Sequence, residues 1–150
     1  MKTINFCDTS AIIKLYHDEI GSAWMETLFD DAESAMIISE LTIVEFYSAI
    51  LKKVRTGEIT NEAKDEAIRN FEKDCRDRYM IPLLDSRIIK NAKNLLNKYG
   101  NNFSFRTLDA IQLAACLNEK TNKIRFICAD VNLLKIGKLE GLQTINPETV

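Results

Sequence analysis

The chain has 150 residues, 46% of them hydrophobic, and a formal net charge of −2. This length and composition allow one substantial core, and the charge excludes a globally basic nucleic-acid binder while permitting a local basic face. No segment has the length and apolar character of a signal peptide or a membrane span, so we expect one domain over residues 1–150, in the cytoplasm and away from membranes.

The first predicted strand ends in an acidic residue. Ile4–Cys7 is typical of a short strand and is followed by Asp8, after which the apolar residues of Ala11–Tyr16 recur at helical spacing. Asp8 therefore lies at a strand-to-helix junction, where Asp8, Thr9 or Ser10 could also cap the helix. Taken alone, capping explains Asp8 about as well as a functional role does.

The next segments place a glutamate in apolar surroundings. A helix at about 21–30 and a strand over Ala35–Ser39 precede a helix over Leu41–Leu51 that is apolar almost all round and contains Glu45. A carboxylate in such surroundings must be hydrogen-bonded, protonated or bound to a cation. A purely structural role is therefore harder to assign to Glu45 than to Asp8.

Helices and strands continue to alternate in the middle of the chain. We expect helices at about 60–78 and 86–99, a short strand near Ile81–Leu84 and a loop over Asn101–Ser104. The 60–78 helix mixes charges of both signs, which is typical of a solvent-exposed helix.

Two further acids occur in the last third. The Arg106–Leu117 segment reads as a core helix with Asp109 in its first turn, where the helix dipole also favours an acid. The strand over Ile124–Ala129 ends at Asp130, which could alternatively initiate a turn. This arrangement repeats the strand followed by an acid at the start of the chain.

The alternation, completed by a strand near Leu142–Ile145, predicts an α/β fold: a parallel sheet with helices on both faces. In such sheets ligands bind beyond the carboxyl ends of the strands, where the strand order reverses. If the first strand and the one before Asp130 flank that point, Asp8 and Asp130 share a crevice. Glu45 and Asp109 can reach that crevice from either side.

Four carboxylates in one crevice repel one another unless a divalent cation compensates. Because no His or Cys accompanies them to favour zinc, their oxygen ligands indicate Mg²⁺ or Mn²⁺. Metals of this kind commonly act on phosphates.

Four motifs, in this order and spacing, resemble those of PIN-domain ribonucleases, most of all the VapC-type toxins of toxin–antitoxin pairs. The motifs are Asp8-Thr9-Ser10-Ala11, Leu41-Thr42-x-x-Glu45, Leu108-Asp109-Ala110-Ile111-Gln112-Leu113-Ala114 and Ala129-Asp130-x-x-Leu133. The resemblance covers essentially the whole chain. It implies a three-layer α/β/α sandwich with a five-stranded parallel sheet.

The resemblance also assigns roles to residues. Asp8 matches the first acid of the family, a direct metal ligand, and Asp109 matches the other main ligand. Glu45 matches the helix-embedded glutamate and Asp130 the fourth acid. Thr9 matches a small hydroxyl residue that could orient a carboxylate or a water.

The implied activity is that of a Mg²⁺- or Mn²⁺-dependent endoribonuclease. One or two ions held by Asp8 and Asp109, with Glu45 and Asp130 completing the shell, would activate a water for in-line attack on the scissile phosphorus. The resemblance implies products with 5′-phosphate and 3′-hydroxyl ends, a cognate antitoxin and a homodimer.

The cysteines lack the spacing of a metal site. Cys7, Cys75, Cys116 and Cys128 contain no Cys-x-x-Cys pair, so we expect reduced thiols, largely buried. Where the family often has Thr-x-Asp, this chain has Cys-Ala-Asp, so any hydroxyl contact from position 128 is expected to be lost.

Two surfaces have open interpretations. Basic residues recur on two helices, at Lys52, Lys53, Arg55, Arg87, Lys90, Lys93 and Lys98. A phosphate-binding stripe and solvated helix faces explain them about equally well. The apolar face formed by Trp24, Met25, Leu28 and Phe29 is by default core, with an antitoxin or dimer groove as the alternative.

Two other function classes compete. A phosphoacceptor receiver domain has a similar α/β alternation, but it usually needs paired acids early in the chain and a late lysine after a strand, which this chain lacks. A catalytically silent PIN-like scaffold that binds protein or RNA is the second. The presence of all four acids favours the enzyme.

Overall fold

The structure is a computed structural model that describes residues 2–121 and 123–150. The strands in these residues are β1 (Thr3–Cys7), β2 (Ser34–Ile37), β3 (Tyr79–Met80), β4 (Ile124–Ile127) and β5 (Gln143–Ile145). The helices are α1 (Thr9–Ile12), the 3-10 helix η1 (Ile13–Leu15), α2 (Ser22–Asp30), α3 (Glu40–Arg55), α4 (Asn61–Asp77), α5 (Ser86–Tyr99), α6 (Thr107–Asn118) and α7 (Val131–Leu139).

The strands form one parallel sheet with the order β3-β2-β1-β4-β5. The chain starts in the middle at β1, moves outward through β2 and β3, and then returns to the other side of β1 for β4 and β5. The strand order therefore reverses between β1 and β4, where Cys7 pairs with Ile127. The predicted α/β fold with a five-stranded parallel sheet is confirmed.

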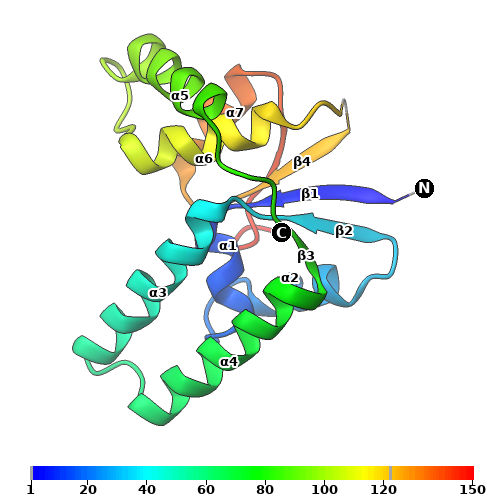
Figure 1. Ribbon diagram of the computed structural model, residues 1–150, viewed down its shortest axis with the longest axis vertical. Helices are drawn as coiled ribbons and strands as arrows, with labels where there is room; N and C mark the ends of the chain where they lie inside the picture. The colour runs from blue at the N-terminus through cyan, green and yellow to red at the C-terminus, as the bar shows by residue number, and fades with distance from the viewer. Residues whose placement is uncertain (1, 122) are drawn as a thin grey trace.

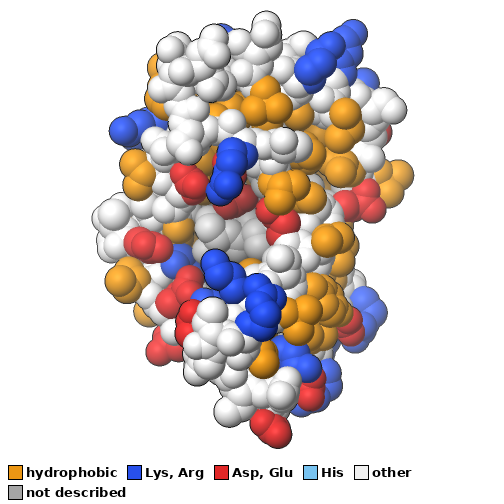
Figure 2. Space-filling model, turned by 90° about the vertical axis from the view of Figure 1, so that its left-hand side faces the viewer, with side chains coloured by type: hydrophobic (Ala, Val, Ile, Leu, Met, Phe, Trp, Pro, Cys, Tyr) orange, Lys and Arg blue, Asp and Glu red, His pale blue; other side chains and the backbone are white. Residues whose placement is uncertain are grey.

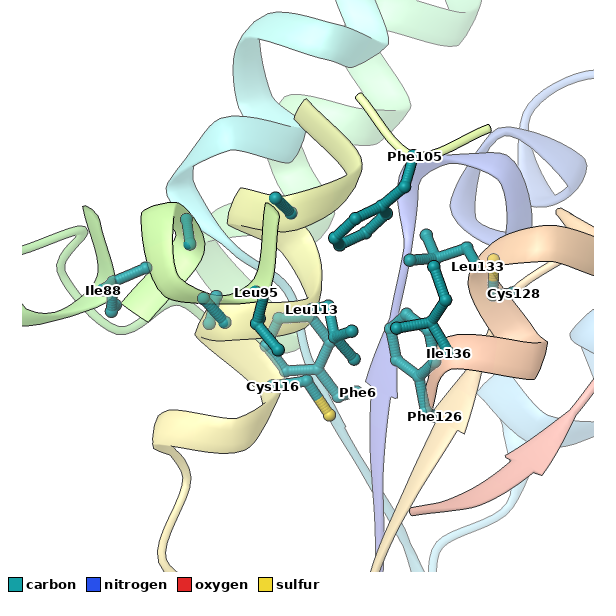
Figure 3. Packing of buried hydrophobic residues seen from close by; sticks show 14 of the residues in the cluster. Phe6, Ile88, Leu95, Phe105, Leu113, Cys116, Phe126, Cys128, Leu133 and Ile136 are labelled. Atoms are coloured by element: carbon teal, nitrogen blue, oxygen red, sulfur yellow. The ribbon is translucent and has the colours of Figure 1, made fainter. Parts of the chain in front are cut away.

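Helices cover both faces of the sheet, as Figure 1 shows. Successive residues of a strand point to opposite faces, so Phe6 and Phe126 pack in the core under α5, α6 and α7. Cys7 and Ile127 pack in the second core, against α1 to α4. Figure 3 shows the first core, where Phe6 and Phe126 lie between Leu113 of α6 and Ile136 of α7.

Helix α3 carries Glu45 and is fixed at several points. The Ser39 side chain caps it by accepting a hydrogen bond from the backbone of its first turn, and the basic residues of its last turn complement the helix dipole. Phe46 is fully buried and stacks on Phe71 of α4, with ring centroids 3.9 Å apart. This packing sets the rotation of α3, and Glu45 meets Thr9 just beyond β1.

Two details differ from the sequence prediction. The expected strand near Ile81–Leu84 is wrong, because β3 comprises Tyr79 and Met80, and the Ile38 N–H donates to Met80 O at 3.0 Å. Pro82 has no N–H to continue the ladder. Helix α7 was not predicted, since Gly137 interrupts its apolar pattern.

Among the helices described, none is both long and apolar enough to cross a membrane.

Candidate functional site

The acids after β1 and β4 lie where the strand order reverses. The backbone N–H of Asp8 donates to Ile127 O at 2.9 Å, which ties the end of β1 to the end of β4. Asp130 follows β4 after two intervening residues and begins α7. The prediction that the first strand and the strand before Asp130 flank this point is confirmed. Ligands of open parallel sheets bind at this edge.

Asp8 is a buried carboxylate that also caps α1. It is 8% exposed, and its Oδ2 accepts hydrogen bonds from Ser10 Oγ at 2.7 Å and from Ser10 N at 3.3 Å. Burial raises the pKa of Asp8, the Ser10 hydrogen bonds lower it and the Glu45 charge raises it, which leaves it at about 6 against an ordinary 3.8. Keeping Asp8 ionised in the folded protein therefore costs free energy.

Glu45 reaches the same edge from α3. Thr9 Oγ1 donates to Glu45 Oε1 at 2.7 Å, and Gln112 Nε2 donates to the same oxygen at 2.7 Å. Of the three states open to a carboxylate in this helix, hydrogen bonding is the one observed. The Thr9 contact agrees with the orienting role that the resemblance implies for this residue.

Asp109 and Asp130 form a second acidic pair. Asp109 is half-buried and accepts a hydrogen bond from Arg106 N at 3.2 Å, while the exposed Asp130 caps α7 by accepting one from Leu133 N at 3.0 Å. Burial is the main cause that raises the pKa of Asp109; the Arg106 hydrogen bond lowers it and the Asp130 charge raises it. Each acid thus has a capping role and also repels its neighbour.

Cys128 connects the two pairs. Its thiol donates to Asp8 Oδ2 at 3.6 Å, and its sulfur accepts the Asp130 N–H at 3.3 Å. Burial raises the pKa of this thiol, so it stays protonated and able to donate. A hydroxyl contact from position 128 is absent, as expected, and the thiol contacts the carboxylate instead. The expectation that no cysteine accompanies the acids is therefore wrong.

The carboxylates are arranged as two pairs and not as a closed cluster. In the part of the chain that the structure describes, no three His, Cys, Asp or Glu side chains stand so that they could hold one metal ion. The donor chemistry fits a hard divalent cation, because the ligands are carboxylate oxygens whose burial and like charge raise the pKa of Asp8 and of Asp109. Within residues 2–121 and 123–150, no Lys or Arg forms an ion pair with any of the four acids.

Sequence analysis missed residues that support these acids. Ser10 holds Asp8, while Thr42 and Gln112 stand behind Glu45 and are 0% and 1% exposed. Both Thr42 and Gln112 occur inside the motifs named above. A polar residue in an otherwise apolar helical stretch was the available signal, and it applies to Gln112 as it did to Glu45.

Figure 2 views the carboxyl edge of the sheet, where a hollow is bordered by acidic side chains with basic groups above and below it. Some of the basic residues are neutralised: Lys53 pairs with Glu58 at 3.3 Å and Lys98 with Glu140 at 2.9 Å. Lys52 and Lys53 also help to line a groove of about 310 Å³ that Ser10 borders. The basic residues thus serve in part as structural ion pairs.

The apolar face of α2 packs against the core. Met25 is 0% and Leu28 6% exposed, and Trp24 and Phe29 are half-buried against the same cluster. The default reading of this face is confirmed. It therefore gives no support to a dimer groove.

The sequence and the fold were compared with known proteins. A sequence model of the family described as PIN domain matches residues 6–139. No curated protein matches the chain significantly.

Solved structures share the fold at low identity. VapBC2 from Rickettsia felis, bound to a promoter DNA fragment, is 13% identical with a TM-score of 0.67, over 95% of this chain and 98% of that chain. VapC20 of Mycobacterium tuberculosis, described as a sarcin-ricin loop cleaving toxin, is 13% identical with a TM-score of 0.66, over 92% and 95%. A toxin–antitoxin complex from Klebsiella pneumoniae is 16% identical with a TM-score of 0.64, over 97% and 99%. At these identities the likeness shows the fold alone.

Proposed function

The chain belongs to the PIN-domain family, and from this premise we propose that it is a metal-dependent endoribonuclease, one nuclease domain that acts in the cytoplasm as the toxin of a type II toxin–antitoxin pair. The observation that carries the proposal is the electrostatics of the acids at the carboxyl edge of the sheet: the pKa values of the buried Asp8 and the half-buried Asp109 are both raised by burial and by a neighbouring acid. Asp8 and Glu45 repel each other, as do Asp109 and Asp130, and among the described residues no Lys or Arg forms an ion pair with them, although the Arg106 charge lowers the pKa of Asp109. A protein that needed only helix caps could use neutral Ser or Asn there.

The four acids would hold Mg²⁺ or Mn²⁺, with Asp8 and Asp109 as the main ligands. The ion, when bound, would neutralise the carboxylates and activate a water for in-line attack on the scissile phosphorus. Among the described residues no three of these side chains stand so that they could hold one ion, so each ion would be held by one or two carboxylates and by waters, as Mg²⁺ commonly is. Ser10 and Cys128 orient Asp8 through hydrogen bonds to Oδ2.

Relatives support the proposed partners. The Klebsiella pneumoniae structure is a toxin–antitoxin complex, the Rickettsia felis structure is of VapBC2, and the Mycobacterium tuberculosis protein is described as a sarcin-ricin loop cleaving toxin. We propose an RNA substrate, a cognate antitoxin and a homodimer for this chain. Four free cysteines in the described residues agree with a reducing compartment.

The test is cleavage of total cellular RNA by purified protein free of antitoxin, with Mg²⁺ or Mn²⁺. We expect discrete fragments that disappear with chelator and with Asp109→Asn, which keeps the side-chain volume and the capping contact. Fragments that persist in both controls would identify a contaminating nuclease. Absence of cleavage of any RNA with either metal would reject the enzyme.

A catalytically silent scaffold is the second candidate, because no closed metal cluster is present in the described residues. It predicts that RNA or an antitoxin binds equally well with and without Mn²⁺. Calorimetric titration of the metal-free protein with Mn²⁺ separates the two, since only the nuclease requires a saturable site that Asp8→Asn removes.

A further inference from the structure

Behind Glu45 lies a cluster of buried hydroxyl and amide groups. Gln112 Nε2 is 2.7 Å from Glu45 Oε1, 2.9 Å from Thr42 Oγ1 and 3.2 Å from Thr9 Oγ1. The two threonine hydroxyls are 3.0 Å apart. The cluster joins α1 and α3, on one face of the sheet, to α6 on the other.

The hydrogens of this cluster can be assigned. Thr9 donates to Glu45 Oε1, so its oxygen is free to accept the Thr42 hydroxyl hydrogen. Thr42 in turn accepts from the Gln112 amide, whose other hydrogen goes to Glu45 Oε1. Every hydroxyl donates once, and Glu45 Oε1 accepts twice.

The orientation of the amide follows from Glu45. Gln112 is 1% exposed, and its Oε1 has no hydrogen-bond partner among the described residues. Turning the amide over would place Gln112 Oε1 about where Nε2 is now, next to the carboxylate oxygen, so two acceptors would face each other. This orientation directs both amide hydrogens at Glu45 and Thr42, and no described residue donates to Gln112 Oε1.

We infer that Gln112 is a positioning residue which, with Thr9 and Thr42, clamps Oε1 of Glu45 and leaves Oε2 as the oxygen that Glu45 offers to a cation. This inference rests on the proposed function. Among the described residues, the side-chain hydrogen bonds of Glu45 go to Oε1, which agrees with such a division of its two oxygens. Gln112 lies one turn after Asp109 on α6, so the clamp also fixes Glu45 relative to that acid.

The test is Gln112→Met, which keeps the length of the side chain and removes both the donors and the unsatisfied oxygen. We expect the Mn²⁺ dissociation constant to rise by about 10- to 100-fold, the range for losing a partner of a metal ligand. The unfolding temperature in chelator should fall, because Glu45 Oε1 and Thr42 Oγ1 each lose a donor inside the protein. In a Glu45→Ala background, Gln112→Met should change the Mn²⁺ affinity no further.

Cys116→Ala is the matched control. Cys116 is buried one turn further along α6 and has no contact with the four acids. This substitution should lower the unfolding temperature and leave the Mn²⁺ affinity unchanged. If Gln112→Met binds Mn²⁺ as the parent does, or if Cys116→Ala weakens binding equally, the positioning role is refuted.

A readout without metal keeps the inference separate from the proposed function. The side-chain amide protons of Gln112, followed by NMR in chelator, should exchange slowly in the parent and faster in Glu45→Ala. Thr42→Val, a milder change, should also speed this exchange. Exchange at the rate of a free glutamine would refute the clamp, whereas slow exchange in a parent that binds no Mn²⁺ would uphold the clamp and reject the proposed function.

Discussion

Two buried charges, six positions apart, are treated in opposite ways by this fold. Lys14 is 3% exposed, and its Nζ lies 2.9 Å from Glu19 Oε1 and 3.0 Å from Glu148 Oε2. Asp8 is 8% exposed, and the charge that shifts its pKa is the like charge of Glu45. Lys14 lies between two carboxylates of opposite charge, whereas Asp8 is held by Ser10 and Cys128 and is repelled by Glu45.

The pKa values express the difference. Burial lowers the pKa of Lys14, but Glu19 and Glu148 more than offset this and leave it raised, so the lysine stays charged. For Asp8, burial and Glu45 act in the same direction and raise the pKa to about 6. The Lys14 charge is thus matched by two glutamates, whereas no Lys or Arg among the described residues forms an ion pair with Asp8. A buried ion pair is thus a structural feature, and a buried group of like charges indicates a site for an ion.

The largest expected difference between the Asp8 and Lys14 regions is in the rate of RNA cleavage. Asp8→Asn removes a proposed ligand and should reduce RNA cleavage by at least about 100-fold, because a metal ion contributes several kcal/mol to stabilising the transition state. Lys14→Met, which leaves the four acids untouched, should retain cleavage. The measurement is the initial rate in saturating Mn²⁺ at a temperature where both variants are folded. Equal losses would mean that the comparison reflects stability alone.

The effect of Asp8→Asn on the stability of the metal-free protein should depend on pH. Because the native pKa of Asp8, about 6, exceeds its ordinary 3.8, the native state binds more protons than the unfolded state between these values, and stability falls as pH rises through them. Asp8→Asn should therefore be more stable than the parent at about pH 7, by up to about 3 kcal/mol, with the gain vanishing below about pH 4. Asparagine keeps the helix cap.

Urea unfolding in chelator at several pH values measures this difference. A gain that does not depend on pH would show that the Asp8 charge is not its source. A loss at every pH would make Asp8 chiefly a structural residue.

Replacing Lys14 should lower the stability of the protein, whereas replacing Asp8 should raise it. Lys14→Met leaves Glu148 without this partner, whereas Glu19 still pairs with Lys53 at 3.5 Å, and the two glutamates are 36% and 28% exposed and can be rehydrated. We expect a loss of about 1–3 kcal/mol, below the usual cost of breaking a fully buried pair. Since the Lys14 pKa is raised above its ordinary 10.5, this contribution is present at all lower pH values where the glutamates are ionised, and is lost only as pH rises through the native pKa. Unfolding at about pH 5.5 and pH 8 should give similar losses.

Most of the fold could be predicted from the sequence because apolar residues recur with one spacing in the strands of the sheet and with another in the helices that cover it. Strand alternation at Phe6 and Cys7 already separates the two cores, and the order of the elements implies a parallel sheet. The strand near residue 80 was misplaced because two residues carry too little pattern to set its register. Helix α7 was missed because Gly137 fits against Phe126 in the fold, which the sequence does not reveal.

The four acids could be found from the sequence because a charge in an apolar segment is locally conspicuous. Their supporting residues could not be found in this way, since the role of a threonine or glutamine depends on which residues it contacts in the fold. Gln112 and Thr42 are 70 positions apart and meet because α3 and α6 converge at the end of β1. Likewise, the division of the acids into two pairs depends on side-chain positions and not on spacing.

The smallest expected effect concerns Cys128, which touches the acidic region without adding charge. Cys128→Ser should shift the pKa of Asp8 downward by less than about one unit, because a hydroxyl donates more strongly than a thiol and hydrogen bonds to the ionised form favour it. Stability should change by less than about 1 kcal/mol, since the serine hydroxyl can use the same neighbours, Asp8 Oδ2 and Ser10 Oγ. Carboxyl NMR titration of Asp8 in metal-free protein measures the shift, with Cys75→Ser, at a half-buried thiol that makes no contact with Asp8, as the control. An unchanged Asp8 pKa would mean that the thiol fills space beside the carboxylate without donating to it, and the electrostatic contrast between Asp8 and Lys14 would then rest on burial and Glu45 alone.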